Sequence, residues 1–158
     1  KVAIYGNRIQ NTGRAIFLFG AHSDAAVYGN VCRTMADNGI RVSTSNGGSF
    51  TDNQAVAVVG NVVEGTAIDG IRVDALKSTI ASNIVRLSAQ RGIKSDLCKN
   101  TIISGNVVSD CSMEGIYFAQ AATVEYTGFF SQNLIENNSV NSNGAVGIRI
   151  QGGGFVRS

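Results

Sequence analysis

Residues 58–74 read VVGNVVEGTAIDGIRVD, and a related phrase occurs five more times along the chain. Each phrase contains an asparagine and, about nine residues later, a small residue followed by isoleucine. The asparagines are Asn7, Asn30, Asn61, Asn83, Asn106 and Asn138. They are 23, 31, 22, 23 and 32 residues apart, so the unit has 22 or 23 residues and two units are longer. A fixed period of this size predicts a solenoid.

Four apolar columns recur once per unit, and β-branched residues dominate them. Counted from the asparagine they occupy positions −3, +2, +10 and +12; the unit of Asn61 has Val58, Val63, Ile71 and Val73 there. Positions +10 and +12 alternate with the outward positions +11 and +13, which is the period of a strand. We therefore expect three short strands per unit. Stacked units place equivalent strands in parallel, about 4.8 Å apart.

The unit pattern, G-N-x-V and then G-I-x-V after six or seven residues, resembles right-handed parallel β-helix proteins of the pectate-lyase-like group. This group includes phage tailspike polysaccharide depolymerases, polysaccharide lyases and mannuronan C5-epimerases. The resemblance covers nearly the whole chain. It implies an all-β solenoid of about six coils with two longer loops. It also implies that polysaccharide lies along the face of the strand at +10 to +13.

Length and composition agree with one sheet-rich domain. The chain has 158 residues, of which 44% are apolar and 15% charged, with 19 glycines and no proline. A net charge of +2 gives no reason to expect nucleic acid or an anionic membrane as partner. Repeats begin at once after Lys1 and end just before Ser158, without a visible cap. We therefore expect a single β-helix domain over residues 1–158, forming an internal fragment of a longer protein.

Asparagine and cysteine are expected to serve the fold. Each repeated asparagine can adopt left-handed backbone angles at a bend and can hydrogen-bond to the next asparagine and to turn backbone. Three cysteines are an odd number, so no disulfide scaffold is predicted. Cys32 falls in an aliphatic column and is expected to be buried. No Cys or His spacing predicts a metal site.

The outward columns at +11 and +13 carry the candidate chemistry. Asp74 and Asp96 occupy +13 on consecutive coils, about 4.8 Å apart at Cα. Their repulsion would separate a general acid from a general base or nucleophile, so they are predicted to be catalytic. Two other interpretations are a Ca²⁺ ion between them and simple solvated ion pairs. The +11 column is mostly cationic and reads Phe17, Arg41, Arg72, Lys94, Tyr117 and Arg149.

A second predicted carboxylate pair is Asp69 and Glu114, at position +8, where the strand begins. They are two coils apart, about 9.6 Å at Cα, with Arg91 between them. The alternative is a structural ladder of alternating charge. Glycosidases use carboxyl groups about 5 to 5.5 Å apart when retaining and about 6.5 to 9.5 Å apart when inverting. The predicted substrate-binding residues are Arg41, Arg72, Lys94, Arg91 and Tyr117, with Phe50 and Tyr126 from the insertions.

The two insertions, residues 44–54 and 120–130, follow the same strand of units two and five. Insertions of a solenoid collect on its binding face, so we expect them to form the walls of a groove that a sugar chain fills. Phe50 and Tyr126 would line those walls. The floor of the groove would be formed by units three and four.

The leading hypothesis is a tailspike-like module that degrades an acidic polysaccharide as a glycoside hydrolase or lyase. One alternative is a non-catalytic structural or adhesive β-helix with a carbohydrate-binding surface. A second is a uronan C5-epimerase, although such epimerases carry an Asp-Pro-His-Glu motif, and this chain has no proline and a single histidine, His22. The tailspike resemblance also implies a homotrimer and an extracellular or virion-associated location. No cofactor is predicted apart from the Ca²⁺ interpretation.

Overall fold

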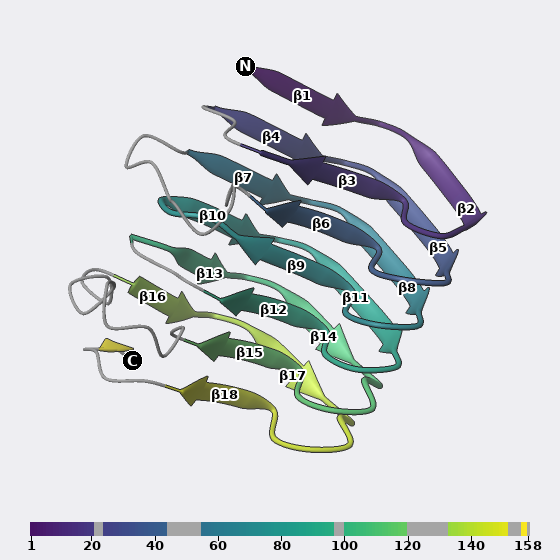
Figure 1. Ribbon diagram of the computed structural model, residues 1–158. Helices are drawn as coiled ribbons and strands as arrows, with labels where there is room; N and C mark the ends of the chain where they lie inside the picture. The colour runs from purple at the N-terminus through teal and green to yellow at the C-terminus, as the bar shows by residue number, and fades with distance from the viewer. Residues whose placement is uncertain (21–23, 44–54, 97–99, 120–132, 152–155, 158) are drawn as a thin grey trace.

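The chain forms a right-handed parallel β-helix in which each coil contributes one strand to each of three sheets (Figure 1). The computed structural model describes residues 1–20, 24–43, 55–96, 100–119, 133–151 and 156–157. All strand pairs in these residues are parallel. The predicted fold class, about six coils with two long intervals, is confirmed. None of the described residues belongs to a helix long and apolar enough to cross a membrane.

The sheets are named A, B and C in the order in which the chain visits them. Sheet A contains β1 (Val2–Tyr5), β4 (Ala25–Tyr28), β7 (Val56–Val59), β10 (Ser78–Ala81), β13 (Ile102–Ser104), β16 (Asn133–Glu136) and β19 (Val156–Arg157). Sheet B contains β2 (Arg8–Thr12), β5 (Val31–Met35), β8 (Val62–Thr66), β11 (Ile84–Ser88), β14 (Val107–Ser109) and β17 (Ser139–Asn141). Sheet C contains β3 (Ile16–Phe19), β6 (Ile40–Ser43), β9 (Ile71–Asp74), β12 (Ile93–Asp96), β15 (Ile116–Ala119) and β18 (Ile148–Gln151).

The predicted apolar columns form the interior. In sheet C, for example, Ile40 pairs with Ile71, Ile71 with Ile93, and Ile93 with Ile116, and all four side chains are fully buried. Equivalent stacks line sheets A and B. Because like side chains lie one above another, each coil buries its apolar residues against the coils before and after it.

The asparagine ladder is also as predicted. Asn83 Nδ2 donates to Asn106 Oδ1 at 3.0 Å and to the Val58 carbonyl at 2.9 Å, while Asn83 Oδ1 accepts from the backbone N–H of Asn61 at 3.0 Å. The same contacts join the other asparagines, including across the intervals of 31 and 32 residues. These bonds satisfy buried polar groups at the bend between sheets A and B.

One expectation about the bend was wrong: the ladder asparagines do not adopt left-handed angles. The residue before each asparagine does so instead, usually glycine, as at Gly29, Gly60 and Gly105. Ser82 and Asn137 take this conformation where glycine is missing. The asparagine side chain is thereby aimed along the stack, and its amide can bond to the next coil.

A second glycine column explains the small residue before each isoleucine. A Cβ added at Gly92 would overlap Val108 Cγ1 and would lie 2.7 Å from the Gly115 carbonyl oxygen. Gly39, Gly70 and Gly115 are equally crowded, whereas the nearest atom to a Cβ at Gly147 would be 3.6 Å away. Close approach of neighbouring coils at the start of the sheet C strands therefore requires glycine.

Candidate functional site

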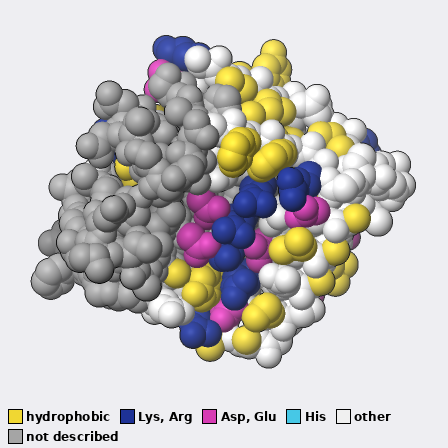
Figure 2. Space-filling view, in the orientation of Figure 1, with side chains coloured by type: hydrophobic (Ala, Val, Ile, Leu, Met, Phe, Trp, Pro, Cys, Tyr) yellow, Lys and Arg dark blue, Asp and Glu magenta, His cyan; other side chains and the backbone are white. Residues whose placement is uncertain are grey.

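The outer face of sheet C carries a strip of cationic side chains. The strip is in register, with Arg41 beside Arg72, Arg72 beside Lys94, and Lys94 beside Tyr117. Figure 2 shows the Lys and Arg side chains gathered on one face, with Asp and Glu side chains on both sides of them. Because neighbouring strands lie about 4.8 Å apart, the charges of Arg41, Arg72 and Lys94 repeat at about that spacing on three successive coils.

Arg72 connects the two aspartates that the sequence places on consecutive coils. Its Nε donates to Asp74 Oδ2 at 2.8 Å, and its Nη2 donates to Asp96 Oδ2 at 3.3 Å. Lys94 Nζ lies 3.0 Å from the same Asp96 oxygen. The structure thus brings Asp74 and Asp96 together, and Arg72, which contacts both, and Lys94, which contacts Asp96, offset their mutual repulsion.

Asp74 also holds the backbone of the next coil. Its Oδ1 accepts a hydrogen bond from the backbone N–H of Asp96 at 3.3 Å, and Ser95 Oγ donates to the Val73 carbonyl at 2.8 Å. The Asp74 side chain is 7% exposed. Burial raises the pKa of Asp74, the charge of Asp96 adds to this rise, and Arg72 opposes it. Asp74 is therefore a structural support as well as a carboxyl group with a raised pKa.

A second charged cluster lies where the sheet C strands begin. Arg91 Nε is 3.1 Å from Glu114 Oε2, and Arg91 Nη1 is 3.9 Å from Asp69 Oδ1. Neither Arg91 Nε nor Glu114 Oε2 has a hydrogen bond of good geometry, so their contact is mainly electrostatic. Arg149 Nη1, from β18, donates to Glu114 Oε1 at 3.0 Å. The predicted residues Asp69, Arg91 and Glu114 therefore alternate in charge along the coils.

The two carboxylates of this second cluster have opposite pKa shifts. Burial raises the pKa of Asp69, and the charges of Lys94 and Arg91 only partly oppose it. Burial acts to raise the pKa of Glu114 too, but its own backbone N–H, the Arg149 hydrogen bond and two guanidinium charges lower it below the usual value. Burial outweighs the neighbouring cations at Asp69, whereas at Glu114 the hydrogen bonds from its own backbone N–H and from Arg149, together with the guanidinium charges, outweigh burial.

Tyr117 joins the cations of both clusters. Its ring centroid lies 4.4 Å from Arg91 Cζ, 5.7 Å from Arg149 Cζ and 6.0 Å from Lys94 Nζ. Its hydroxyl donates to Gln151 Oε1 at 2.9 Å. Such cation–π contacts favour a fixed arrangement of the cations. Arg149 was not among the predicted site residues, although its place in the +11 column was the signal for it.

The cations are, with one exception, more exposed than the acids that hold them. The Arg72 side chain is 26% exposed against 7% for Asp74, and Arg149 is 51% exposed against 3% for Glu114. The Arg91 side chain is likewise more exposed than those of its acidic partners Asp69 and Glu114, while Lys94 is slightly less exposed than Asp96. The acids therefore form a layer beneath the guanidinium groups, and the charge presented to solvent is mainly positive.

Several predicted elements lie outside the described residues. These are His22 and the whole of the two insertions, with Phe50 and Tyr126. The groove walls therefore stay a prediction, as does the Ca²⁺ ion between Asp74 and Asp96. In the structure, Arg72 and Lys94 already take the charge-neutralising role that Ca²⁺ would have there.

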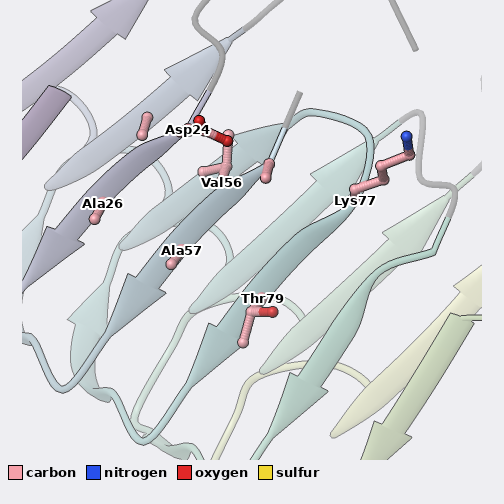
Figure 3. A pocket seen from close by; sticks show the side chains of 8 residues that line it. Asp24, Ala26, Val56, Ala57, Lys77 and Thr79 are labelled. Atoms are coloured by element: carbon pink, nitrogen blue, oxygen red, sulfur yellow. The ribbon is translucent and has the colours of Figure 1, made fainter. Parts of the chain in front are cut away.

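Sheet A carries a shallow groove that contains none of the predicted site residues (Figure 3). Its floor is made of small side chains, with Ala26, Ala57 and Thr79 one above another on β4, β7 and β10. Asp24 and Lys77 stand at its rim. The groove has few polar groups to orient a ligand, unlike the sheet C face.

Comparison with known proteins gives one family and one similar fold. The family described as periplasmic copper-binding protein (NosD) matches residues 1–154. The crystal structure of the periplasmic alginate epimerase AlgG is similar with a TM-score of 0.71 and 15% identity, covering 94% of this chain and 38% of that one. A double mutant of AlgG gives a TM-score of 0.66 at 15% identity, covering 94% and 37%. No curated protein matches the sequence.

At 15% identity the likeness shows the fold, and it agrees with the right-handed β-helix. The chain spans less than two fifths of the length of AlgG.

The described residues do not fit the copper named in the family description. Among them no group of three or more His, Cys, Asp or Glu side chains could hold a metal ion. Cys32 and Cys111 are buried and lie three coils apart. Burial raises the pKa of Cys32 to about 11, which disfavours the thiolate that binds metal. No step of the proposed chemistry is therefore assigned to copper.

Proposed function

We propose that this chain, which belongs to the family described as periplasmic copper-binding protein (NosD), binds an acidic polysaccharide along the outer face of sheet C. One observation carries the proposal: guanidinium groups are held toward solvent by acids buried beneath them, as Arg149 is by Glu114. Cations that are already fixed lose little conformational entropy on binding an anion. A positive charge on successive coils suits a polymer with a negative charge on successive sugars.

Two comparisons support this proposal. AlgG, which shares the fold, is a periplasmic alginate epimerase, and alginate is a polyuronate with a carboxylate on each sugar. The NosD family and AlgG are both described as periplasmic, so we propose that this chain works outside the cytoplasm. Attachment to a virion and assembly into a homotrimer stay predictions.

A second candidate function is cleavage or epimerisation of the bound polysaccharide. The raised pKa of Asp74 favours it, because a carboxyl group that keeps its proton closer to neutral pH can act as a general acid. Asp96 would then act as base or nucleophile, or the pair would move the C5 proton of a uronate. The ion pairs to Arg72 and Lys94 would have to open, or would hold the uronate carboxylate in the complex.

The test measures binding to polygalacturonate, alginate, dextran sulfate and neutral dextran by affinity electrophoresis at low and high salt. We expect retardation by at least one acidic polymer, weakened by salt, and none by dextran. Retardation by dextran as strong as that by the acidic polymers would contradict the proposal. The absence of retardation by every polymer would contradict it too. Reducing ends, unsaturated products and C5 configuration are then followed with wild type and Asp74→Asn/Asp96→Asn. Turnover that persists in the double variant would show that these aspartates are not catalytic.

A further inference from the structure

Arg41 differs from the other cations of the sheet C strip. Arg72, Lys94 and Arg149 each have a nitrogen within 3.3 Å of a carboxylate oxygen. Within the part of the chain that the structure describes, Arg41 has no carboxylate partner, and its Nε is buried without a hydrogen bond. No acceptor among the described residues therefore fixes this guanidinium, and an anionic ligand would be its first ionic partner.

On the coil of Arg41, neutral residues occupy the positions that carry acidic partners on other coils. Ser43 stands in register with Asp74, so coil two has a hydroxyl where coils three and four have Asp74 and Asp96. At position +8 the same coil has the neutral Asn38, where coils three and five have Asp69 and Glu114. These replacements leave the charge of Arg41 uncompensated.

The nearest acid along the chain is Asp37, and it is bound elsewhere. Its Oδ2 accepts from Arg14 Nε at 2.6 Å and also lies 2.6 Å from Arg14 Nη2. The other oxygen, Oδ1, accepts from the backbone N–H of Asn38 at 2.7 Å, so both carboxylate oxygens have partners. Asp37 is therefore the ion-pair partner of Arg14, and it does not neutralise the charge of Arg41.

An aromatic pair adjoins Arg41. Phe17 is its partner in the sheet register, and Arg41 Cζ lies 5.6 Å from the Phe17 ring centroid. The Phe17 and Phe19 rings have centroids 5.8 Å apart, and their residues are 43% and 56% exposed. A half-buried cation beside an exposed apolar surface is a combination that orients a ligand having both an anionic group and an apolar face.

We infer that Arg41 is the anchoring subsite of the strip: its guanidinium takes the carboxylate or sulfate of one sugar, and Phe17 and Phe19 pack against the apolar face of the next. This inference rests on the proposed function, since it names the group that sets affinity within the same face. The paired cations contribute less, because their charge is already shared with acids of the protein. The planar guanidinium favours two-point contact with an anion, which an ammonium cannot reproduce.

The test compares wild type with Arg41→Gln, Arg149→Gln and Arg86→Gln, each against the acidic polymer that wild type binds most tightly. Each variant removes one cation, and Arg86 is an exposed residue of β11 on sheet B. We expect Arg41→Gln to weaken binding at least tenfold, Arg149→Gln about threefold or less, and Arg86→Gln less than twofold. Arg41→Lys should recover only part of the loss. Polygalacturonate and dextran sulfate, run side by side, distinguish a carboxylate from a sulfate ligand.

The outcomes separate this inference from the proposed function. If wild type binds none of the acidic polymers, the proposed function fails and the subsite with it. If wild type binds but Arg41→Gln binds as tightly as Arg86→Gln, only the subsite is wrong. Equal losses in Arg41→Gln and Arg149→Gln would also overturn it, because Arg41 would then be one cation among equals. Arg41→Gln should melt at the wild-type temperature, because no intramolecular hydrogen bond of the side chain is removed.

Discussion

The outer faces of sheets A and C are built on the same coils but differ in charge. The outward positions of β1, β4, β7, β10, β13 and β16 include one charged residue, Glu136, among Ala3, Tyr5, Ala26, Tyr28, Ala57, Val59, Thr79, Ala81, Ile102, Ser104 and Leu134. The corresponding positions of sheet C carry six charged residues, Arg41, Arg72, Asp74, Lys94, Asp96 and Arg149. The interior behind both faces is the same kind of Ile and Val stack.

This difference shows that the inward and outward positions of one strand can have separate tasks. Inward residues join each coil to the next, so they are constrained by volume. Outward residues are free of that constraint, and among the described residues those of sheet C form connected ion pairs, in which Arg72 and Arg149 lie over the buried Asp74 and Glu114. The proposed function therefore depends on the outward residues of one sheet.

The largest expected effect concerns the close approach of coils at the start of the sheet C strands. Gly92→Ala should destabilise the protein by about 3 kcal/mol, because the added Cβ meets Val108 and the Gly115 carbonyl. Gly147→Ala is the matched control, since the nearest atom to its Cβ, Val140 Cγ1, would be 3.6 Å away. Urea unfolding followed by circular dichroism measures both. Similar losses in the two variants would mean that coil spacing does not require glycine.

The next effect compares a supported acid of sheet C with an exposed acid of sheet A. Glu114→Gln should destabilise by about 2 kcal/mol, because Arg91 and Arg149 lose the charge that holds them. Asp24→Asn should change stability little, since Asp24 is exposed and its partner Lys1 lies 4.0 Å away. Thermal unfolding at neutral pH checks this. An equal, small effect of both substitutions would remove the supporting role assigned to the buried acids.

A smaller expected effect is that the contributions of Asp74 and Glu114 to stability change with pH in opposite directions. The pKa of Asp74 is raised on folding by burial, so its contribution to stability is present below the unfolded pKa and is lost as pH rises through the folded pKa. The pKa of Glu114 is lowered overall, against the effect of burial, so its contribution is present above the unfolded pKa and is lost as pH falls through the folded one.

The stability of wild type minus that of Asp74→Asn should therefore fall as pH rises above about 4, whereas wild type minus Glu114→Gln should rise with pH below about 4.5. Urea titrations at several pH values measure both differences. Slopes of the same sign would contradict the assigned environments.

The smallest expected effect is that of Ca²⁺. Arg72 and Lys94 already neutralise Asp74 and Asp96, so millimolar Ca²⁺ or a chelator should leave the melting temperature unchanged. A rise with Ca²⁺ that Asp74→Asn/Asp96→Asn abolishes would show that the aspartates bind the metal and that the cations are displaced.

The sequence predicted the columns well because each is a local, once-per-coil repeat. Asn61, Val63 and Ile71 could be assigned to the ladder, sheet B and sheet C by counting alone. The partners of long side chains could not be obtained that way. Arg149 reaches Glu114 across 35 residues of sequence, and Arg72 reaches past Asp74 to Asp96 on the next coil. These choices depend on rotamers and burial, which the period does not specify.

The hydrogen bond by which Asp74 holds the backbone of the next coil could not be predicted from the sequence either. A carboxylate on an outward column suggests chemistry or an ion pair, but whether it accepts the N–H of Asp96 depends on where the pairing of β9 with β12 ends. The same limit applies to the bend, where Gly60, not Asn61, takes the left-handed angle. Residue type identified the position of each feature, and the three-dimensional register determined its role.

The central claim is that the sheet C face, rather than positive charge in general, binds an acidic polysaccharide. The most direct measurement is the affinity of two double variants that lose the same charge from opposite faces, Arg72→Gln/Lys94→Gln on sheet C and Lys1→Gln/Lys77→Gln on the sheet A side, with folding verified by melting temperature. We predict about tenfold weaker binding for the sheet C variant and a change below twofold for the other. Equal losses in both would contradict the account.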